Sequence, residues 1–154
     1  QWATFKLKAP VFGKINVLRG ASQYANTMAT LLNSGLHMTS AVDITSRVMD
    51  NYRLGSDVGK MTAELEQGKQ LGESMAKIDF IPRPLTEMAA VGEETGELEG
   101  TLATMGEFYD GETDSASEIA LSRVEQRIII IMALFAGYIV IALYLAMFAI
   151  YSGM

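Results

Sequence analysis

Residues 128–150 read IIIIMALFAGYIVIALYLAMFAI, a run of 23 uncharged and mostly apolar residues that decides how the chain folds. A helix of this length spans roughly 34 Å, because each residue adds about 1.5 Å. The hydrocarbon core of a bilayer is about 30 Å thick, so the run predicts a membrane-spanning helix with some tilt. We mark this predicted helix by Ile128, Gly137, Tyr144 and Ile150.

Charge stops where the apolar run begins. All 12 Lys/Arg and all 18 Asp/Glu lie between Lys6 and Arg127. Arg123 and Arg127 precede the run and no charge follows it. The positive-inside rule therefore predicts that the preceding domain is cytoplasmic and that Met154 lies across the membrane.

We expect three parts in the chain, of which only the boundary near residue 127 follows from the distribution of charge. We expect residues 1–9 to end a preceding membrane or linker segment, residues 10–126 to form a cytoplasmic helical bundle, and residues 127–154 to form the transmembrane helix. The chain has no starting Met and no signal-peptide pattern. We therefore expect a fragment or a processed product.

Apolar side chains upstream of the run recur every three or four residues, which is the period of an amphipathic helix. No useful length alternates with period two, so strands are not expected. The pattern predicts an all-α fold, a compact six-helix bundle whose last helix continues into the transmembrane helix. The expected helices are one ending at Gly35, one from about Thr39 with a capping box at Ser40–Asp43, one ending at Gly68, a short one over 71–78, one opened by Pro82 and Pro84, and one from near Glu97 to Met154.

Composition excludes several chemistries. The chain has no Cys, which removes disulfides, thiolate metal sites and Cys nucleophiles. The only histidine, His37, has no convincing nucleophile-and-base set around it. A net charge of −6 argues against nucleic-acid binding, which needs a basic face. We therefore expect no catalytic residue, no cofactor and no bound metal.

Residues 55–62, GSDVGKMT, superficially resemble a phosphate-binding loop. Three residues separate Gly55 from Gly59 where that motif needs four, and Met61 separates Lys60 from Thr62. A helical Gly-x-x-x-Gly face that allows close helix packing explains the pattern better.

The second half of the polar region is strongly acidic. Residues 1–60 hold seven basic and three acidic side chains, whereas residues 61–127 hold five basic and fifteen acidic ones. Three interpretations stay open: a solvated helix face, a docking surface for a basic partner, or a divalent-cation site. The residues of this candidate surface, the acidic patch, are Glu87, Glu94, Glu97, Glu99, Glu107, Asp110, Glu112, Asp114 and Glu118.

Two stretches carry a family resemblance. Residues 23–36, QYANTMATLLNSGL, and residues 91–98, VGEETGEL, resemble motifs of the GspF/PilC family, the inner-membrane platform proteins of type IV pilus and type II secretion machines. The second stretch is similar to the family's Gly-Glu-x-x-Gly-x-Leu motif. The motif positions, which we expect to be structural, are Leu31, Leu32, Gly35, Gly92, Glu93, Thr95, Gly96 and Leu98.

This resemblance implies a cytoplasmic six-helix bundle that occurs twice in a full-length protein, of which this chain is the second copy with the final membrane helix. We expect Gly92 and Gly96 to allow a tight helix–helix turn, Glu93 and Thr95 to cap the next helix, and Leu98 to anchor it. This chain departs from the family pattern at two positions. Family members usually have proline where Gln126 stands, and proline is also common where Ala146 stands, so we expect a straighter membrane helix.

The resemblance also implies a function and its partners. It implies a non-enzymatic homo-oligomeric subunit in the bilayer of the bacterial inner membrane, which couples a hexameric assembly ATPase to pilin or pseudopilin polymerisation and contacts other inner-membrane subunits of the machine. The alternative that the residues leave open is a tail-anchored helical adaptor or signalling protein.

Overall fold

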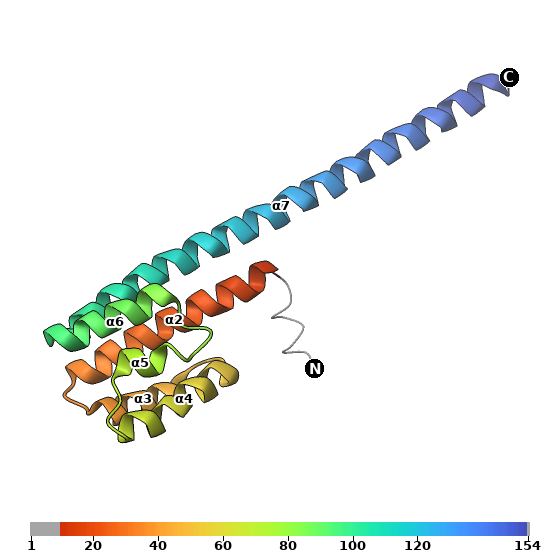
Figure 1. Ribbon diagram of the computed structural model, residues 1–154. Helices are drawn as coiled ribbons and strands as arrows, with labels where there is room; N and C mark the ends of the chain where they lie inside the picture. Colours follow the sequence, from red (N-terminus) through yellow and green to blue (C-terminus); the bar gives the residue numbers. More distant parts are fainter. Residues whose placement is uncertain (1–9, 154) are drawn as a thin grey trace. The chain divides into compact units, whose positions relative to one another are not determined.

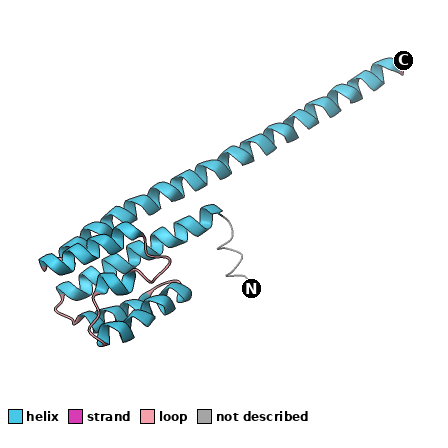
Figure 2. Cartoon of the chain, in the orientation of Figure 1, coloured by secondary structure: helices cyan, strands magenta, loops and turns pink. Residues whose placement is uncertain are grey.

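The computed structural model describes residues 10–153, so the prediction for residues 1–9 lies outside the described part of the chain. The described residues form six helices and no strand, which confirms the predicted all-α class. Figure 1 shows their order and Figure 2 their helical nature. The helices are α2 (Pro10–Asn33), α3 (Met38–Val48), α4 (Tyr52–Glu66), α5 (Leu71–Met75), α6 (Arg83–Thr95) and α7 (Leu98–Ser152).

Local sequence signals account for most helix ends. Gly35, Gly68 and Gly96 all have positive φ, and each follows a helix within one or two residues. Pro84 stands in the first turn of α6, where its missing N–H costs nothing. The side chain of Asn51 caps α4 by accepting a hydrogen bond from the backbone N–H of Arg53 at 3.1 Å.

The expected capping box at Ser40–Asp43 is wrong. Helix α3 already begins at Met38, with His37 in the N-cap position and no side-chain cap. The chain leaves the left-handed Gly35 and is extended at His37, so the helix starts before Ser40 can cap it.

One apolar core joins the helices of the bundle. Its members include several methionines, whose flexible side chains fill irregular gaps between helices. The largest fully buried side chains of the core are Tyr24, Met28, Met61, Leu71, Met75, Leu85 and Leu102. Helix α7 therefore belongs to the bundle at its beginning, through Leu102 and the nearly buried Tyr109.

The chain divides into two compact units, of which the first ends at Ala116 and the second is Ser117–Met154. Helix α7 is unbroken past Gln126 and Ala146, as expected without proline there. It is the one helix among the described residues that is long and apolar enough to cross a membrane, with a mean hydropathy of 2.8 in an 18-residue window that is 0% buried. Ile128, Tyr144 and Ile150 are exposed in this segment, as is Gly137.

Helices α3 and α4 lie side by side and touch at a glycine (Figure 1). Gly55 is buried, and a Cβ built on it would overlap the carbonyl oxygen of Ser46 on α3. Gly59, one turn further, faces the same serine, but a Cβ there would lie at an ordinary 3.7 Å. Residues 55–62 thus lie within α4, and the interpretation of their glycines as a helix-packing face is confirmed.

The contrast between the two glycines yields a stability prediction. Gly55→Ala should lower the free energy of unfolding by about 1–3 kcal/mol, because a backbone carbonyl cannot move aside without displacing α3. Gly59→Ala should be neutral or stabilising by up to about 1 kcal/mol, since alanine is the better helix former. Urea unfolding of the full chain in detergent, followed by circular dichroism, measures both. Equal effects at the two positions would contradict the close contact.

Candidate functional site

The family-like motif forms the turn between α6 and α7. Gly96 ends α6 in the left-handed conformation with φ 75°, and its N–H donates to the carbonyl of Gly92. Gly92 is buried, and a Cβ there would come within 3.0 Å of the Cα of Leu98. Leu98 is 7% exposed and joins the core. The two glycines and the leucine therefore fold α7 back tightly against α6.

Thr95 does not cap the next helix, contrary to expectation. Its hydroxyl donates to the carbonyl of Val91 at 3.0 Å and lies 3.4 Å from that of Gly92. Both partners lie within α6, so the side chain satisfies the last turn of its own helix.

Glu93 caps a helix, but a different one from the helix we expected. Its carboxylate accepts hydrogen bonds from the backbone N–H of Leu71 at 2.6 Å and from that of Gly72 at 3.0 Å. These groups begin α5, whose own N-cap residue, Gln70, makes no side-chain cap. Glu93 therefore fixes α5 against α6 from outside the short helix, with charge-assisted bonds.

Beneath Glu93 lies a buried phenol. Tyr24 on α2 is fully buried, and its hydroxyl has no hydrogen-bond partner within the described part of the chain. Burial first, and then the negative charge of Glu93, raises the pKa of Tyr24 above its ordinary value. The tyrosine thus stays neutral and contributes mainly packing volume.

The first-helix motif has polar contacts that the sequence did not reveal. The side chain of Gln23 donates to the carbonyl of Val48 at 3.3 Å and accepts from the N–H of Asp50 at 3.2 Å. It thereby ties α2 to the α3–α4 turn. The expected motif positions Leu31 and Leu32 pack partly buried against the core, and Gly35 is exposed just after α2.

A second polar bridge joins α2 to α7. Asp110 accepts hydrogen bonds from the hydroxyl of Ser22 and, at 3.0 Å, from the side-chain amide of Asn26. Gly106 lies one turn before Asp110, and a Cβ there would lie 2.6 Å from the Cγ of Asn26. Asp110, predicted as part of the acidic patch, is therefore bound to its own bundle.

The structure brings the other predicted patch residues to the surface. Glu87 and Glu94 lie on α6, Glu97 lies in the turn, and the rest lie on α7. All are exposed, and within residues 10–153 none forms an ion pair with Lys or Arg. Glu107 and Asp114 are seven residues apart and so share one face of α7. These carboxylates are thus open to a partner.

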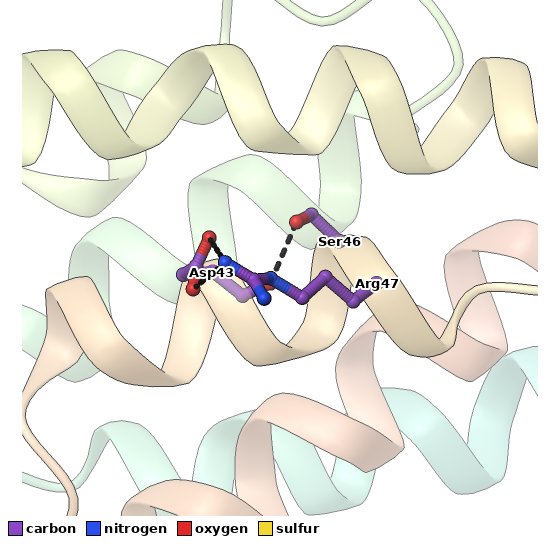
Figure 3. A network of polar contacts seen from close by, with 3 residues as sticks. All are labelled: Asp43, Ser46 and Arg47. Carbon is purple, nitrogen blue, oxygen red and sulfur yellow. Dashed lines mark hydrogen bonds and ion pairs between the residues drawn. The ribbon is translucent and has the colours of Figure 1, made fainter.

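Ion pairs occur elsewhere and have a local role. Figure 3 shows Asp43, Ser46 and Arg47 on α3, where the guanidinium of Arg47 lies 3.1 Å from the carboxylate of Asp43. The hydroxyl of Ser46 donates to the carbonyl of Asp43 at 2.6 Å. An exposed pair within one helix contributes about 0.3–0.5 kcal/mol, so this network stabilises α3 and forms no site.

Glu64 is the centre of a larger cluster. The ammonium group of Lys77 lies 2.7 Å from its carboxylate and that of Lys69 lies 3.7 Å away. The hydrogen bond from Lys77 is the main cause that lowers the pKa of Glu64, and the same bond raises the pKa of Lys77. The cluster joins the end of α4 to the residues around α5.

Within the described residues, no group of three His, Cys, Asp or Glu side chains is arranged to hold a metal ion. His37 is exposed at the start of α3. The motif residues thus take part in helix packing and capping. The exposed carboxylates that form no ion pair among the described residues are the groups that remain available for binding.

Together these features define a helical bundle whose last helix carries a membrane-spanning segment. Residues 24–146 match the family model described as "Type II secretion system (T2SS), protein F", so the chain belongs to this family. The resemblance to the GspF/PilC family is thereby confirmed.

Individual relatives agree with the family match. The chain is 33% identical to the type IV pilus assembly protein PilC of Thermus thermophilus, over 94% of this chain and 36% of that protein. It is 30% identical to PilC of Pseudomonas aeruginosa, over 92% and 38%. It is 25% identical to type II secretion system protein F of Aeromonas hydrophila, over 92% and 37%. The chain thus spans little more than a third of the length of these curated relatives.

The Glu93 contact predicts a large effect from one of two neighbouring glutamates. Glu93→Ala should lower the free energy of unfolding by about 2 kcal/mol, because two N–H groups of α5 lose a charged acceptor. Glu94→Ala removes an exposed carboxylate and should change stability by less than about 0.5 kcal/mol. Hydrogen exchange should show faster exchange of the Leu71 and Gly72 amides in the Glu93 variant only. Unchanged protection of these amides would refute the capping role.

Proposed function

We propose that the chain is part of a non-enzymatic platform subunit of the bacterial inner membrane, which couples a hexameric cytoplasmic ATPase to the polymerisation of pilin or pseudopilin subunits. The observation that carries this proposal is the family match over residues 24–146, which includes both the bundle and most of the apolar run. Identities to pilus assembly proteins run from 25% to 33% and those to type II secretion proteins F from 25% to 29%, so the proposal covers both branches.

The engagement of the motif residues supports a mechanical rather than a chemical role. Gly92, Gly96 and Leu98 set the α6–α7 turn, and Glu93 holds α5. Because these residues already pack against or bind the backbone of the bundle, they are not available to bind a substrate. The subunit accordingly transmits motion or holds its partners, and nucleotide hydrolysis belongs to the ATPase.

The acidic patch supports the choice of partner surface. Its exposed carboxylates lack ion-pair partners among the described residues, so a basic surface can approach without first displacing lysines or arginines. Complementary charge accelerates encounter and selects partners. We assign the patch to the ATPase, and the membrane helix to lipid, to pilin and to the other inner-membrane subunits, including further copies of the same subunit.

Charge reversal tests the assignment of the patch. Glu107→Lys with Asp114→Lys should weaken co-purification with the ATPase about tenfold at low salt, and less at high salt, because exposed charges are screened. The matched control is Glu66→Lys with Asp79→Lys, which changes net charge equally at exposed positions outside the patch. ATP hydrolysis should appear only when the ATPase is added. Equal binding by both double variants, each folded normally, would sink the assignment.

Membrane orientation is a separate prediction. The positive-inside rule, applied to Arg123 and Arg127, predicts that the bundle is cytoplasmic and that the end of α7 lies on the other side of the membrane. The chain has no cysteine, so single reporters are possible. In spheroplasts, an impermeant maleimide should label Ser152→Cys directly and Ser56→Cys only after lysis. Direct labelling of Ser56→Cys, with Ser152→Cys labelled only after lysis, would show the opposite topology.

A further inference from the structure

A groove of about 340 Å³ opens between the last turns of α2 and the first turns of α7. All of it lies within the compact unit that ends at Ala116. Its volume is at the lower end of the range of ligand pockets, which suits one side chain better than a free metabolite. The residues that line it are Ala29, Thr30, Asn33, Glu99, Gly100 and Ala103.

The groove lies next to the place where α2 and α7 are in close contact. Near Asp110, α2 and α7 are held in contact by the hydrogen bonds that Asp110 accepts from Ser22 and Asn26. At Gly106 the contact is so tight that a Cβ would collide with Asn26. Nearly two turns earlier, at Gly100, a Cβ would meet nothing within 4 Å. The contact between α2 and α7 is therefore closed at Gly106 and Asp110, and the groove lies next to it at the end of α2.

Gly100 has no role in the fold that explains it. It lies inside α7, it is not among the glycines of positive φ, and no neighbour crowds it. A glycine within a helix is less favourable than an alanine. Since Gly100 lines the groove, any side chain there would reduce its volume. The glycine keeps the space open.

The charge in the lining of the groove is exclusively negative. Glu99 is its only charged residue, and Thr30 and Asn33 supply neutral polar groups. The chain carries no basic residue between Arg83 and Arg123. The dipole of α7 stabilises an acidic residue in its first turn, which accounts for Glu99 but not for the cavity beside it.

We propose that this groove receives an arginine side chain presented by a basic partner protein. A guanidinium is planar and carries five N–H donors, which the Glu99 carboxylate and the Asn33 amide oxygen can accept. The aliphatic stem of the arginine would pack against Ala29 and Ala103. The inference rests on the proposed function, under which the partner is the assembly ATPase.

Filling the groove tests the proposal. Binding of the ATPase to the subunit in nanodiscs is measured by biolayer interferometry. Gly100→Leu should weaken binding at least about tenfold, because the side chain occupies the groove. The control is Gly111→Leu, which lies on the same helix, is exposed, and likewise has nothing within 4 Å of a Cβ. It should change affinity less than about twofold.

A second pair of variants tests the charge without altering the shape. Glu99→Gln should speed dissociation about fivefold, because a partly desolvated ion pair is lost. Glu107→Gln removes a carboxylate of the acidic patch outside the groove, and should mainly slow association. Identical kinetic effects of the two variants would overturn the role of the groove, even if Gly100→Leu does not fold.

The outcomes separate the two proposals. If the wild-type subunit does not bind the ATPase, the proposed function fails and this inference fails with it. If the wild type binds and Gly100→Leu binds equally well, only the groove proposal is overturned. If Gly100→Leu changes self-association in sedimentation but leaves ATPase binding intact, the occupant is a second copy of the subunit, which also overturns it.

Discussion

The carboxylate of Glu93 holds together parts of the bundle that no local pattern would join. It accepts from two backbone N–H groups of α5 while it stands on α6, and its charge acts on the buried phenol of Tyr24 on α2. Helix α5 has only five residues, far too few to be stable alone. Besides the burial of Leu71 and Met75 in the core, this acceptor fixes the position of α5 and the close packing of Gly72 against Ala90.

The parts of the fold that the sequence predicted well are those that local rules determine. Glycines of positive φ end helices wherever they stand, and an apolar period near 3.6 indicates a helix regardless of its neighbours. The Gly55–Gly59 spacing was likewise sufficient to favour helix packing over nucleotide binding. The capping box at Ser40 failed because a four-residue match is weak, and the preceding turn at Gly35 had already set where α3 begins.

The candidate site was harder to predict because its contacts are distant in sequence. Glu93 reaches N–H groups 21 and 22 positions away, and Asp110 reaches residues 84 and 88 positions away. Nothing in the spacing of acidic residues distinguished Asp110, which accepts hydrogen bonds from α2, from Asp114, which has no such bond among the described residues. A useful signal existed for Glu93 alone: a short helix without its own N-cap needs an acceptor from another element.

The contact between Gly55 and Ser46 has a mechanical consequence. Two helices that meet without room for a methyl group cannot slide along each other unless they first lift apart. Helices α3 and α4 must therefore travel as a single rigid block. The hydrogen bonds at Glu93 and Asp110 differ from this contact, because they can break and form again without opening the core.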